Sequence, residues 1–286
     1  MSSETVPNRF SEVAKYILHA TDFSEDSEFA FAHALRLAVN NHARLTIMHV
    51  SRDKHADWDS FPSVRETLQR WGMLEPGARR ADVSKLGIEI EKINVYDTSN
   101  IVGGISSYLD KGSVDMLVLA TRQRTGLANW LKPSTAEQVS RKMALPTLFV
   151  PSGVHGCVSP DDGHVTLDHI LIPVDHTPPA GGAIERALRA LTAFGKNNAT
   201  LTLLHVGADQ SYPHVTVPEG PWKVVKISRE GRPVTEILNA AEEGGANLII
   251  MVTKGSQGFL DMLRGTTTEQ VLQNAHCPVL SIPADF

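Results

Sequence analysis

The chain contains the same succession of segments twice. Residues 45–50 read LTIMHV and residues 201–206 read LTLLHV, so that His205 follows His49 by 156 residues. A short run that ends in an aspartate precedes each of them, YILHATD in the first copy and HILIPVD in the second. Because solenoid repeats are much shorter than this, the duplication predicts two copies of one domain.

Each copy alternates short apolar runs with segments whose apolar residues recur at helical spacing. Such an alternation predicts parallel βαβ units with right-handed crossovers and helices on both faces of a sheet. We therefore expect an α/β fold of two tandem doubly wound, Rossmann-like domains, each with an open parallel sheet. The expected strands lie at 16–20, 45–50, 88–95, 116–119, 146–150, 169–175, 201–206, 248–251 and 278–282.

A polar stretch separates the two copies. Residues 152–167 are rich in Gly, Pro, Ser and Asp and show no apolar period, which is typical of a linker. The predicted domains are therefore 1–151 and 168–286. The first helix of each domain should start at a capping residue, Ser24 in the first and Thr177 in the second, where Pro178 would take the first helical position.

The first copy carries an insertion between its second and fourth strands. Pro278 follows Pro146 by only 132 residues, so the 156-residue offset upstream leaves 156 minus 132, or 24, extra residues in the first copy. They fall in a helical segment at about 55–87, where we expect one helix opened by Pro62 and a second, short helix around 81–86. The run that follows, IEIEKINV, alternates apolar and polar residues as an exposed edge strand does.

The large apolar side chains of this insertion allow two interpretations. They could cover the first domain, or they could line a pocket for a small apolar ligand. The cover is favoured, because aromatic residues at helical spacing are usually part of a core. The residues are Trp58, Phe61, Trp71 and Leu74.

Composition excludes several classes of protein. A net charge of −5 argues against non-specific binding of nucleic acid. The two cysteines lack CxxC spacing, and the twelve histidines show no HExxH pattern, so we expect no metal site and interpret His49 and His205 as structural. No signal peptide or apolar run of membrane-spanning length is visible, which makes the cytoplasm the expected compartment and a membrane partner unexpected.

Catalytic motifs are missing as well. The chain has no GxSxG elbow, no complete Walker motif and no evident pair of nucleophile and base. We therefore predict no catalytic residues and no enzymatic activity.

One loop has the composition of an anion-binding site. Residues 252–268 read VTKGSQGFLDMLRGTTT, which places a glycine turn after a strand and a glycine with hydroxyls before a helix. Backbone amides and the helix dipole at such a position favour a phosphate group. A glycine turn alone occurs in most α/β domains, so the spacing of the second glycine is what favours a nucleotide site.

The order of these segments resembles the universal stress protein family in its tandem, two-domain form. The resemblance rests on the run that ends in Asp22 with Phe23-Ser24, on LTIMHV and LTLLHV, and on the glycine loop that precedes a helix and the Cys277-Pro278-Val279 strand. The resemblance occurs once in each half and together covers nearly the whole chain.

The resemblance implies an adenine-nucleotide site, for ATP or ADP, in the second half. The family's nucleotide-binding members carry Gly, two residues, Gly, nine residues, then Gly with Ser or Thr. Here Val252 occupies the first of these places, while Gly255 and Gly265-Thr266 fit the others. By the same resemblance, Pro173 and Asp175 line the base and ribose side. The implied site comprises Pro173, Asp175, Val252, Lys254, Gly255, Gly265, Thr266 and Thr267.

The corresponding loop of the first half departs from the pattern. Its three places read Ala120, Gln123 and Pro133-Ser134. Proline lacks an N–H donor and glutamine resists a left-handed turn, so we expect no nucleotide there and a structural role for Asp22.

The resemblance also implies how the chain functions and assembles. We expect a stress-response regulator whose two halves pack as an internal pseudo-dimer through residues 147–150 and 279–282, with a further homodimer allowed. Unknown proteins and the nucleotide would be its partners, and a metal would be present only with the nucleotide. The alternative is a scaffold that binds no nucleotide in either half, which Val252 favours because its branched side chain could crowd the phosphate.

Overall fold

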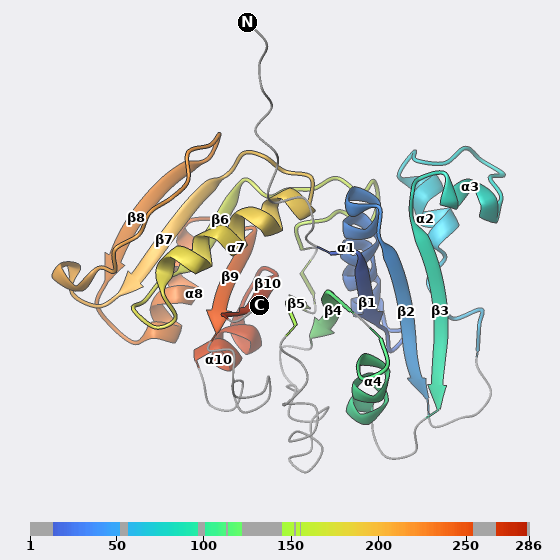
Figure 1. Ribbon diagram of the computed structural model, residues 1–286, viewed down its shortest axis with the longest axis horizontal. Helices are drawn as coiled ribbons and strands as arrows, with labels where there is room; N and C mark the ends of the chain where they lie inside the picture. The colour runs from blue at the N-terminus through green and yellow to red at the C-terminus, as the bar shows by residue number, and fades with distance from the viewer. Residues whose placement is uncertain are drawn as a thin grey trace, which may run out of the picture.

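The computed structural model shows an open α/β sheet that runs the length of the molecule (Figure 1). The structure describes residues 14–51, 57–96, 101–112, 114–121, 145–151, 153–154, 156–253 and 267–284. Among these residues, no helix has both the length and the apolar character needed to cross a bilayer.

The described strands form one ten-stranded sheet in the order β3-β2-β1-β4-β5-β10-β9-β6-β7-β8. All neighbouring strands are parallel except β5 and β10, which are antiparallel. This confirms the doubly wound, open parallel sheets. The strands are β1 (Tyr16–Ala20), β2 (Arg44–Ser51), β3 (Glu89–Tyr96), β4 (Met116–Thr121), β5 (Thr147–Pro151), β6 (His169–Pro173), β7 (Thr200–Val206), β8 (Lys223–Arg229), β9 (Leu248–Thr253) and β10 (Val279–Pro283).

The two halves of the sheet meet at the antiparallel pair. Phe149 lies opposite Val279, and Leu148 lies opposite Leu280. The contact between 147–150 and 279–282 is thus confirmed, and it hides two strand edges that would otherwise be exposed. The outer strands are β3, as its alternating sequence predicted, and β8.

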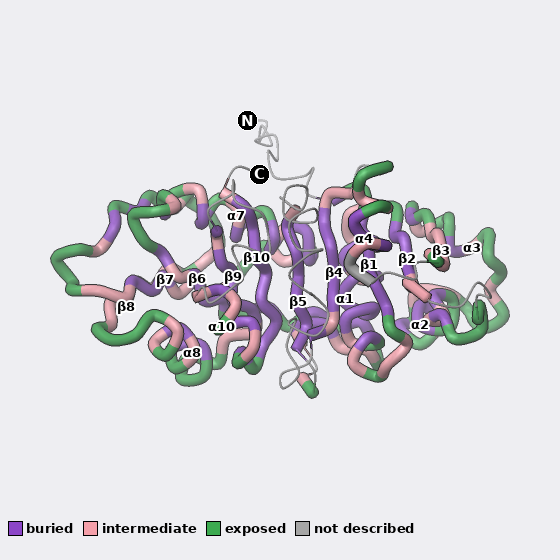
Figure 2. The backbone as a smooth tube through the Cα atoms, turned by 90° about the horizontal axis from the view of Figure 1, so that it is seen from below, coloured by how far each residue is buried: buried purple, intermediate pink, exposed green. Residues whose placement is uncertain are grey.

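Helices cover both faces, as two separate clusters of buried side chains show. One cluster contains residues of α1, α2, α3 and α7, and the other contains residues of α4, α8 and α10. Figure 2 shows the buried positions along the central strands, with exposed positions at the two ends of the sheet. The helices are α1 (Glu25–Asn41), α2 (Val64–Arg70), α3 (Arg80–Ser84), α4 (Ile101–Leu109), α7 (Ala180–Ala193), α8 (Pro233–Glu243), α10 (Thr267–Asn274) and the 3-10 turn η1 (Asp209–Ser211).

The starts of the helices agree with the sequence in the first half and differ in the second. Ser24 caps α1 by accepting a hydrogen bond from the amide of Ser27, as predicted. The prediction for α7 was wrong, because the helix begins at Ala180 with Pro179 in the capping position. Thr177 and Pro178 each precede a proline, which disfavours helical geometry at both residues.

The insertion folds against the first half largely as expected. Its first helix begins at Val64, two residues after Pro62, and its second is α3. Phe61 and Trp71 are buried, which confirms that they form a cover. Trp58 does not share this role, because 54% of its surface is exposed.

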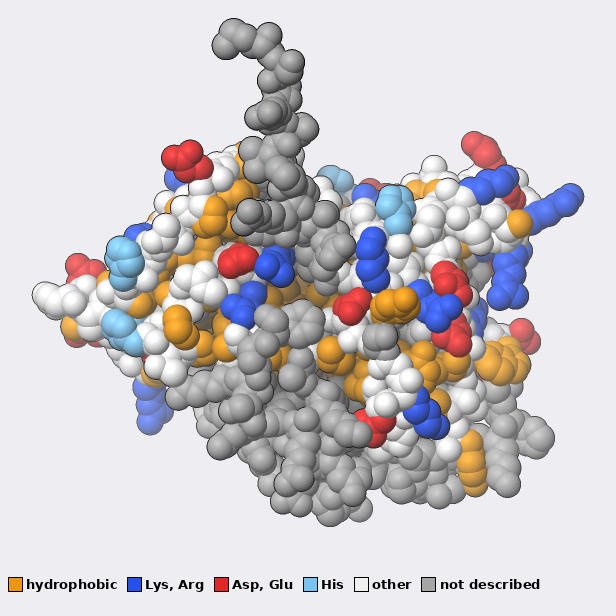
Figure 3. Space-filling view, viewed as in Figure 1, with side chains coloured by type: hydrophobic (Ala, Val, Ile, Leu, Met, Phe, Trp, Pro, Cys, Tyr) orange, Lys and Arg blue, Asp and Glu red, His pale blue; other side chains and the backbone are white. Residues whose placement is uncertain are grey.

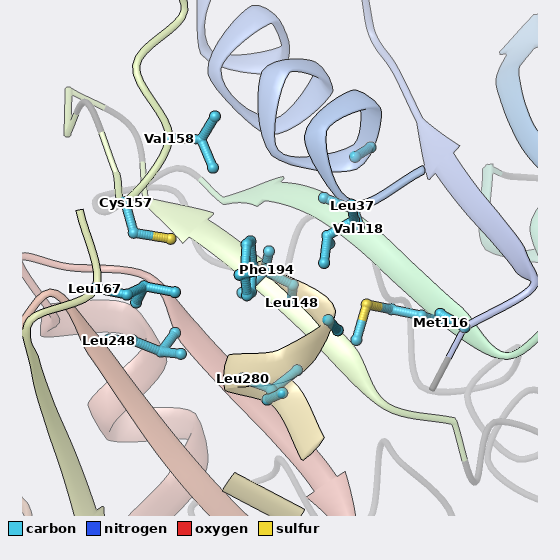
Figure 4. Close-up of a cluster of buried hydrophobic side chains, with 14 of the residues drawn as sticks. Leu37, Met116, Val118, Leu148, Cys157, Val158, Leu167, Phe194, Leu248 and Leu280 are labelled. Carbon is cyan, nitrogen blue, oxygen red and sulfur yellow. The ribbon is translucent and has the colours of Figure 1, made fainter. Parts of the chain in front are cut away.

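The segment that joins the halves is packed into the core. Cys157, Val158 and Leu167 are buried within the same cluster as Phe194, which follows α7 (Figure 4). The sequence did not predict this packing, because residues 152–167 are mainly polar and their buried residues do not recur at a regular spacing. Because the cluster contains residues from both halves, the segment connects two parts of one continuous core. The boundaries 1–151, 152–167 and 168–286 stay a prediction.

Two glycines allow this segment to approach its neighbours closely. Gly163 has a φ of +69°, and a Cβ atom there would lie 2.5 Å from the indole of Trp71. At Gly156, with a φ of +75°, a Cβ atom would lie 2.3 Å from the imidazole of His33. Glycine is therefore required at both positions.

Two buried histidines should make the protein sensitive to acid. Burial lowers the pKa of both His19 and His33 from 6.5 to about 4, despite opposing hydrogen bonds with backbone carbonyls. The unfolded chain then binds more protons than the folded chain between these values, so the free energy of unfolding falls as the pH drops from 6.5 towards 4. We expect each histidine to remove about 2 kcal/mol of stability between pH 7.5 and pH 5.

Urea titrations at several pH values test this expectation. His19→Phe should remove about half of the loss attributed to the two histidines, because a phenyl ring cannot be protonated. An unchanged pH profile in this variant would contradict the assignment to His19.

Candidate functional site

The candidate site lies at the carboxyl ends of β6 and β9. A pocket of about 220 Å³ opens there, and Pro173, Asp175, Val252 and Thr267 all line it. In open parallel sheets ligands bind at this edge. The structure thus brings together every residue of the implied site that it describes. Lys254, Gly255, Gly265 and Thr266 lie outside the described residues.

Strand pairing explains why these residues meet although they are far apart in the chain. β6 pairs with β9 through Leu171 and Ile249, so both strands deliver their last residues to the same edge. The chain then continues past β6, where the Val174 amide donates to the Leu204 carbonyl at 2.8 Å. That bond aligns the start of the loop containing Asp175 with the end of β7.

Asp175 is an exposed carboxylate with spare capacity to accept hydrogen bonds. Its Oδ1 accepts a hydrogen bond of 2.7 Å from the amide of the next residue, His176. A carboxylate offers about four acceptor positions. Asp175 can therefore accept further bonds from the hydroxyls of a ligand.

The equivalent Asp22 is bound within its own helix cap. Its Oδ1 accepts bonds from the amide of Ser24 at 3.1 Å, the hydroxyl of Ser24 at 2.5 Å and the hydroxyl of Ser27 at 2.7 Å. These contacts fix the start of α1 and confirm the structural role expected for Asp22.

An aromatic side chain covers the corresponding edge of the first half. Phe23 stacks on His49 with ring centroids 4.0 Å apart, and it meets the ring of Phe61 edge-on at 5.1 Å. Its φ of +62° is unfavourable for a bulky side chain, so the surrounding packing must hold it. In the second half His176 occupies the equivalent position, and its Nε2 lies 3.0 Å from the Ser211 carbonyl oxygen.

The walls of the pocket are mainly apolar, and some of them escaped prediction. They come from the end of β7, the start of α8 and the residues beside those predicted. Val206 and Met251 could have been predicted, because they lie near the carboxyl ends of β7 and β9, where ligands bind in open parallel sheets. Pro233 could not have been predicted, because its position depends on how α8 packs. The lining residues missed include Thr177, Pro178, Val206, Pro233, Met251 and Thr268.

Two features oppose the binding of a phosphate. Val252 is half-buried and packs against the core, so its side chain occupies part of the wall. Glu269 lies in the first turn of α10, where a carboxylate interacts favourably with the helix dipole and would repel an incoming anion.

The strand histidines have structural partners. His49 Nδ1 lies 2.8 Å from the Thr21 carbonyl oxygen, while His205 interacts with the Val174 carbonyl and the Ser211 hydroxyl. Within the described part of the chain, no three His, Cys, Asp or Glu residues are placed to hold a metal ion.

Comparison with known proteins places both halves in one family. The family model described as the universal stress protein family matches residues 14–151 and 217–283. Residues 152–216, which contain Pro173 and Asp175, lie outside both matches. Even so, β6, α7 and β7 repeat the order of β1, α1 and β2.

Relatives match a single half or the whole chain. A universal stress protein of Methanocaldococcus jannaschii is 47% identical over 149 residues, covering 42% of this chain and 85% of that protein. One of Mycolicibacterium smegmatis is 25% identical over 307 residues, covering 93% of this chain and 96% of that protein. The crystal structure of a universal stress protein from Archaeoglobus fulgidus superimposes with a TM-score of 0.60 at 19% identity, covering 96% of this chain and 97% of that one. Because the family model matches both halves and similar proteins extend along the full length, the chain belongs to the universal stress protein family in its tandem form.

Proposed function

We propose that this protein is a cytoplasmic regulator of the stress response that binds one adenine nucleotide, ATP or ADP, in its second half. The observation that carries the proposal is the pocket at the ends of β6 and β9, where Pro173, Asp175, Val252 and Thr267 come together. The first half, with Asp22 engaged and Phe23 stacked on His49, would bind none.

Each part of the pocket suits a different part of a nucleotide. The Asp175 carboxylate would accept hydrogen bonds from the ribose hydroxyls, and Pro173 would contact the base. Thr267 and Thr268, at the start of α10, would face the phosphates with hydroxyls and helix-end amides. Lys254, Gly255, Gly265 and Thr266 would complete the phosphate site, and any metal would accompany the phosphates.

The proposed role is regulatory rather than catalytic. Burial raises the pKa of Cys277 to about 12 and also raises the pKa of Cys157, so both thiols stay protonated and make poor nucleophiles. With His49 and His205 bonded to structural partners, neither is positioned as a general base for a nucleophile in the described part of the chain.

The small volume of the pocket and the negative charge beside it favour one rival function. In this rival, the protein is a scaffold that acts through protein partners and binds no nucleotide. The 220 Å³ of the pocket is below the roughly 300–1,000 Å³ typical of small-molecule sites. Val252 and Glu269 add steric and electrostatic opposition. This rival predicts no affinity for ATP or ADP.

Replacing the two equivalent aspartates separates these possibilities. In calorimetric titrations with ATP and ADP, Asp175→Asn should weaken binding about ten-fold or more, because a charged acceptor is lost. Asp22→Asn should leave the affinity unchanged and lower the stability of the protein by about 1 kcal/mol through the weakened cap of α1.

The variants Asp175→Asn and Asp22→Asn can also contradict the proposal. Equal loss of affinity in both variants would place the nucleotide elsewhere, and a folded wild-type protein that releases no heat and shows no thermal shift with either nucleotide would support the scaffold.

A further inference from the structure

A second and larger cavity lies at the far end of the sheet, in the insertion unique to the first half. Its volume is about 630 Å³, within the range of small-molecule sites. It lies between α2, α3 and the edge strand β3. The residues that define its character are Trp58, Arg65, Arg80, Val83, Ile90 and Lys92.

The charge lining this cavity is mainly positive. Arg65, Arg80 and Lys92 contribute three cations, and Glu89 is the one carboxylate among the lining residues. Glu89 is already paired with Arg44 at 2.5 Å. Figure 3 shows Lys and Arg side chains, with Asp and Glu side chains among them, at the end of the molecule that carries α3 and β3.

The positive charge of Lys92 is only partly compensated by its surroundings. Its pKa is lowered by burial and by the positive charge of Arg80, while the charge of Glu66 opposes these effects only in part. Within the described residues, no carboxylate lies within ion-pair distance of Lys92. An anion in the cavity would relieve the repulsion between Lys92 and Arg80.

The cavity also has an aromatic wall. Trp58 is 54% exposed although it is a large apolar side chain, and its ring stacks on Phe61 with centroids 5.3 Å apart. The Lys92 ammonium lies 5.8 Å from the centroid of the same Phe61 ring. A cation and an exposed aromatic face are thus arranged around one buried ring.

We propose that this cavity binds a small amphipathic acid, a planar aromatic or apolar body that carries a carboxylate. Its body would lie against Trp58, Val83 and Ile90, and its carboxylate would lie between Lys92 and Arg80. This site is separate from the pocket at the ends of β6 and β9, and it does not depend on nucleotide binding there.

The second half supplies a matched control. Lys226 occupies the position in β8 that Lys92 occupies in β3, since Leu203 and Ile47 are their respective partners. Its ammonium also lies over an aromatic ring, 5.9 Å from the centroid of Tyr212. Lys226 is exposed, however, and the stretch between β7 and β8, all of which is described, contains no counterpart of the inserted α2 and α3.

An NMR titration of the full chain with 2-naphthoate tests the proposal. We expect binding in the submillimolar range, weakened about five-fold or more in Lys92→Met and in Trp58→Ala. Lys226→Met and Asp175→Asn should bind as the wild type does. Neutral 2-naphthamide, which keeps the ring and loses the charge, should bind about five-fold more weakly than naphthoate to the wild type.

Three results would overturn the proposal. They are no saturable binding of naphthoate by the wild type, equal affinity for naphthoate and naphthamide, and equal losses in Lys92→Met and Lys226→Met. Because Trp58 is exposed and Lys92 is only partly buried, circular dichroism should show that each variant remains folded.

Discussion

His33→Phe should destabilise the protein by about 3–5 kcal/mol at neutral pH, as measured by urea unfolding. His33 Nε2 accepts hydrogen bonds from the backbone amides of Cys157 at 3.0 Å and Val158 at 3.2 Å. Its Nδ1 lies 2.7 Å from the Phe29 carbonyl oxygen, which assigns the ring proton to Nδ1. A phenyl ring fills similar space and leaves both amides buried without an acceptor, each at a cost of roughly 1–3 kcal/mol.

The same substitution at His19 is the control. His19 is equally buried, but its Nε2 has no hydrogen-bond partner among the described residues, and its Nδ1 lies within hydrogen-bond distance of the Val118 carbonyl oxygen. His19→Phe should therefore cost about 1 kcal/mol at neutral pH. Equal costs for the two variants would show that the contact between His33 and the connecting segment contributes little.

Phe194→Ala should cost about 3–5 kcal/mol, the usual range for removing a fully buried aromatic ring. Phe194 follows α7 and is 1% exposed, in the cluster that also contains Leu148 of β5 and Leu280 of β10. Because this cluster includes residues of both halves, the variant should still unfold in a single transition, at a lower urea concentration. Fluorescence and circular dichroism should give coincident curves.

Trp58→Ala provides the comparison for an exposed aromatic residue and should change stability by less than about 1 kcal/mol. If Phe194→Ala instead produced two separate transitions, with one half unchanged, the halves would be independent folding units, and the continuous core would not couple them.

Sequence alone predicted nine of the ten described strands and missed the outer strand β8. The duplicated segments LTIMHV and LTLLHV became β2 and β7, and the final runs of each half met as β5 and β10. The strands were predictable from local apolar periodicity, whereas the contact between β5 and β10 was predicted only from the resemblance to the universal stress protein family. The packing of 156–167 could not be predicted, since it depends on a distant acceptor, His33, and on two glycines that permit close approach.

The site was predictable to a similar extent. The resemblance to the family assigned Asp175 and Val252 to one site, and both line the same pocket at the carboxyl edge of the sheet. The sequence showed only part of the difference between the two candidate nucleotide sites. Sequence showed the altered loop of the first half, but only the structure shows Asp22 bound by hydroxyls and Phe23 stacked over the strand end.

The most direct test of the account is mass spectrometry of small molecules released when freshly purified protein is denatured. The account predicts ATP or ADP at up to one molecule per chain, retained in Asp22→Asn and strongly reduced in Asp175→Asn. Two nucleotides per chain, or equal retention in both variants, would contradict a site confined to the second half. A folded protein that carries no nucleotide and takes up none when ATP is added would contradict nucleotide binding altogether.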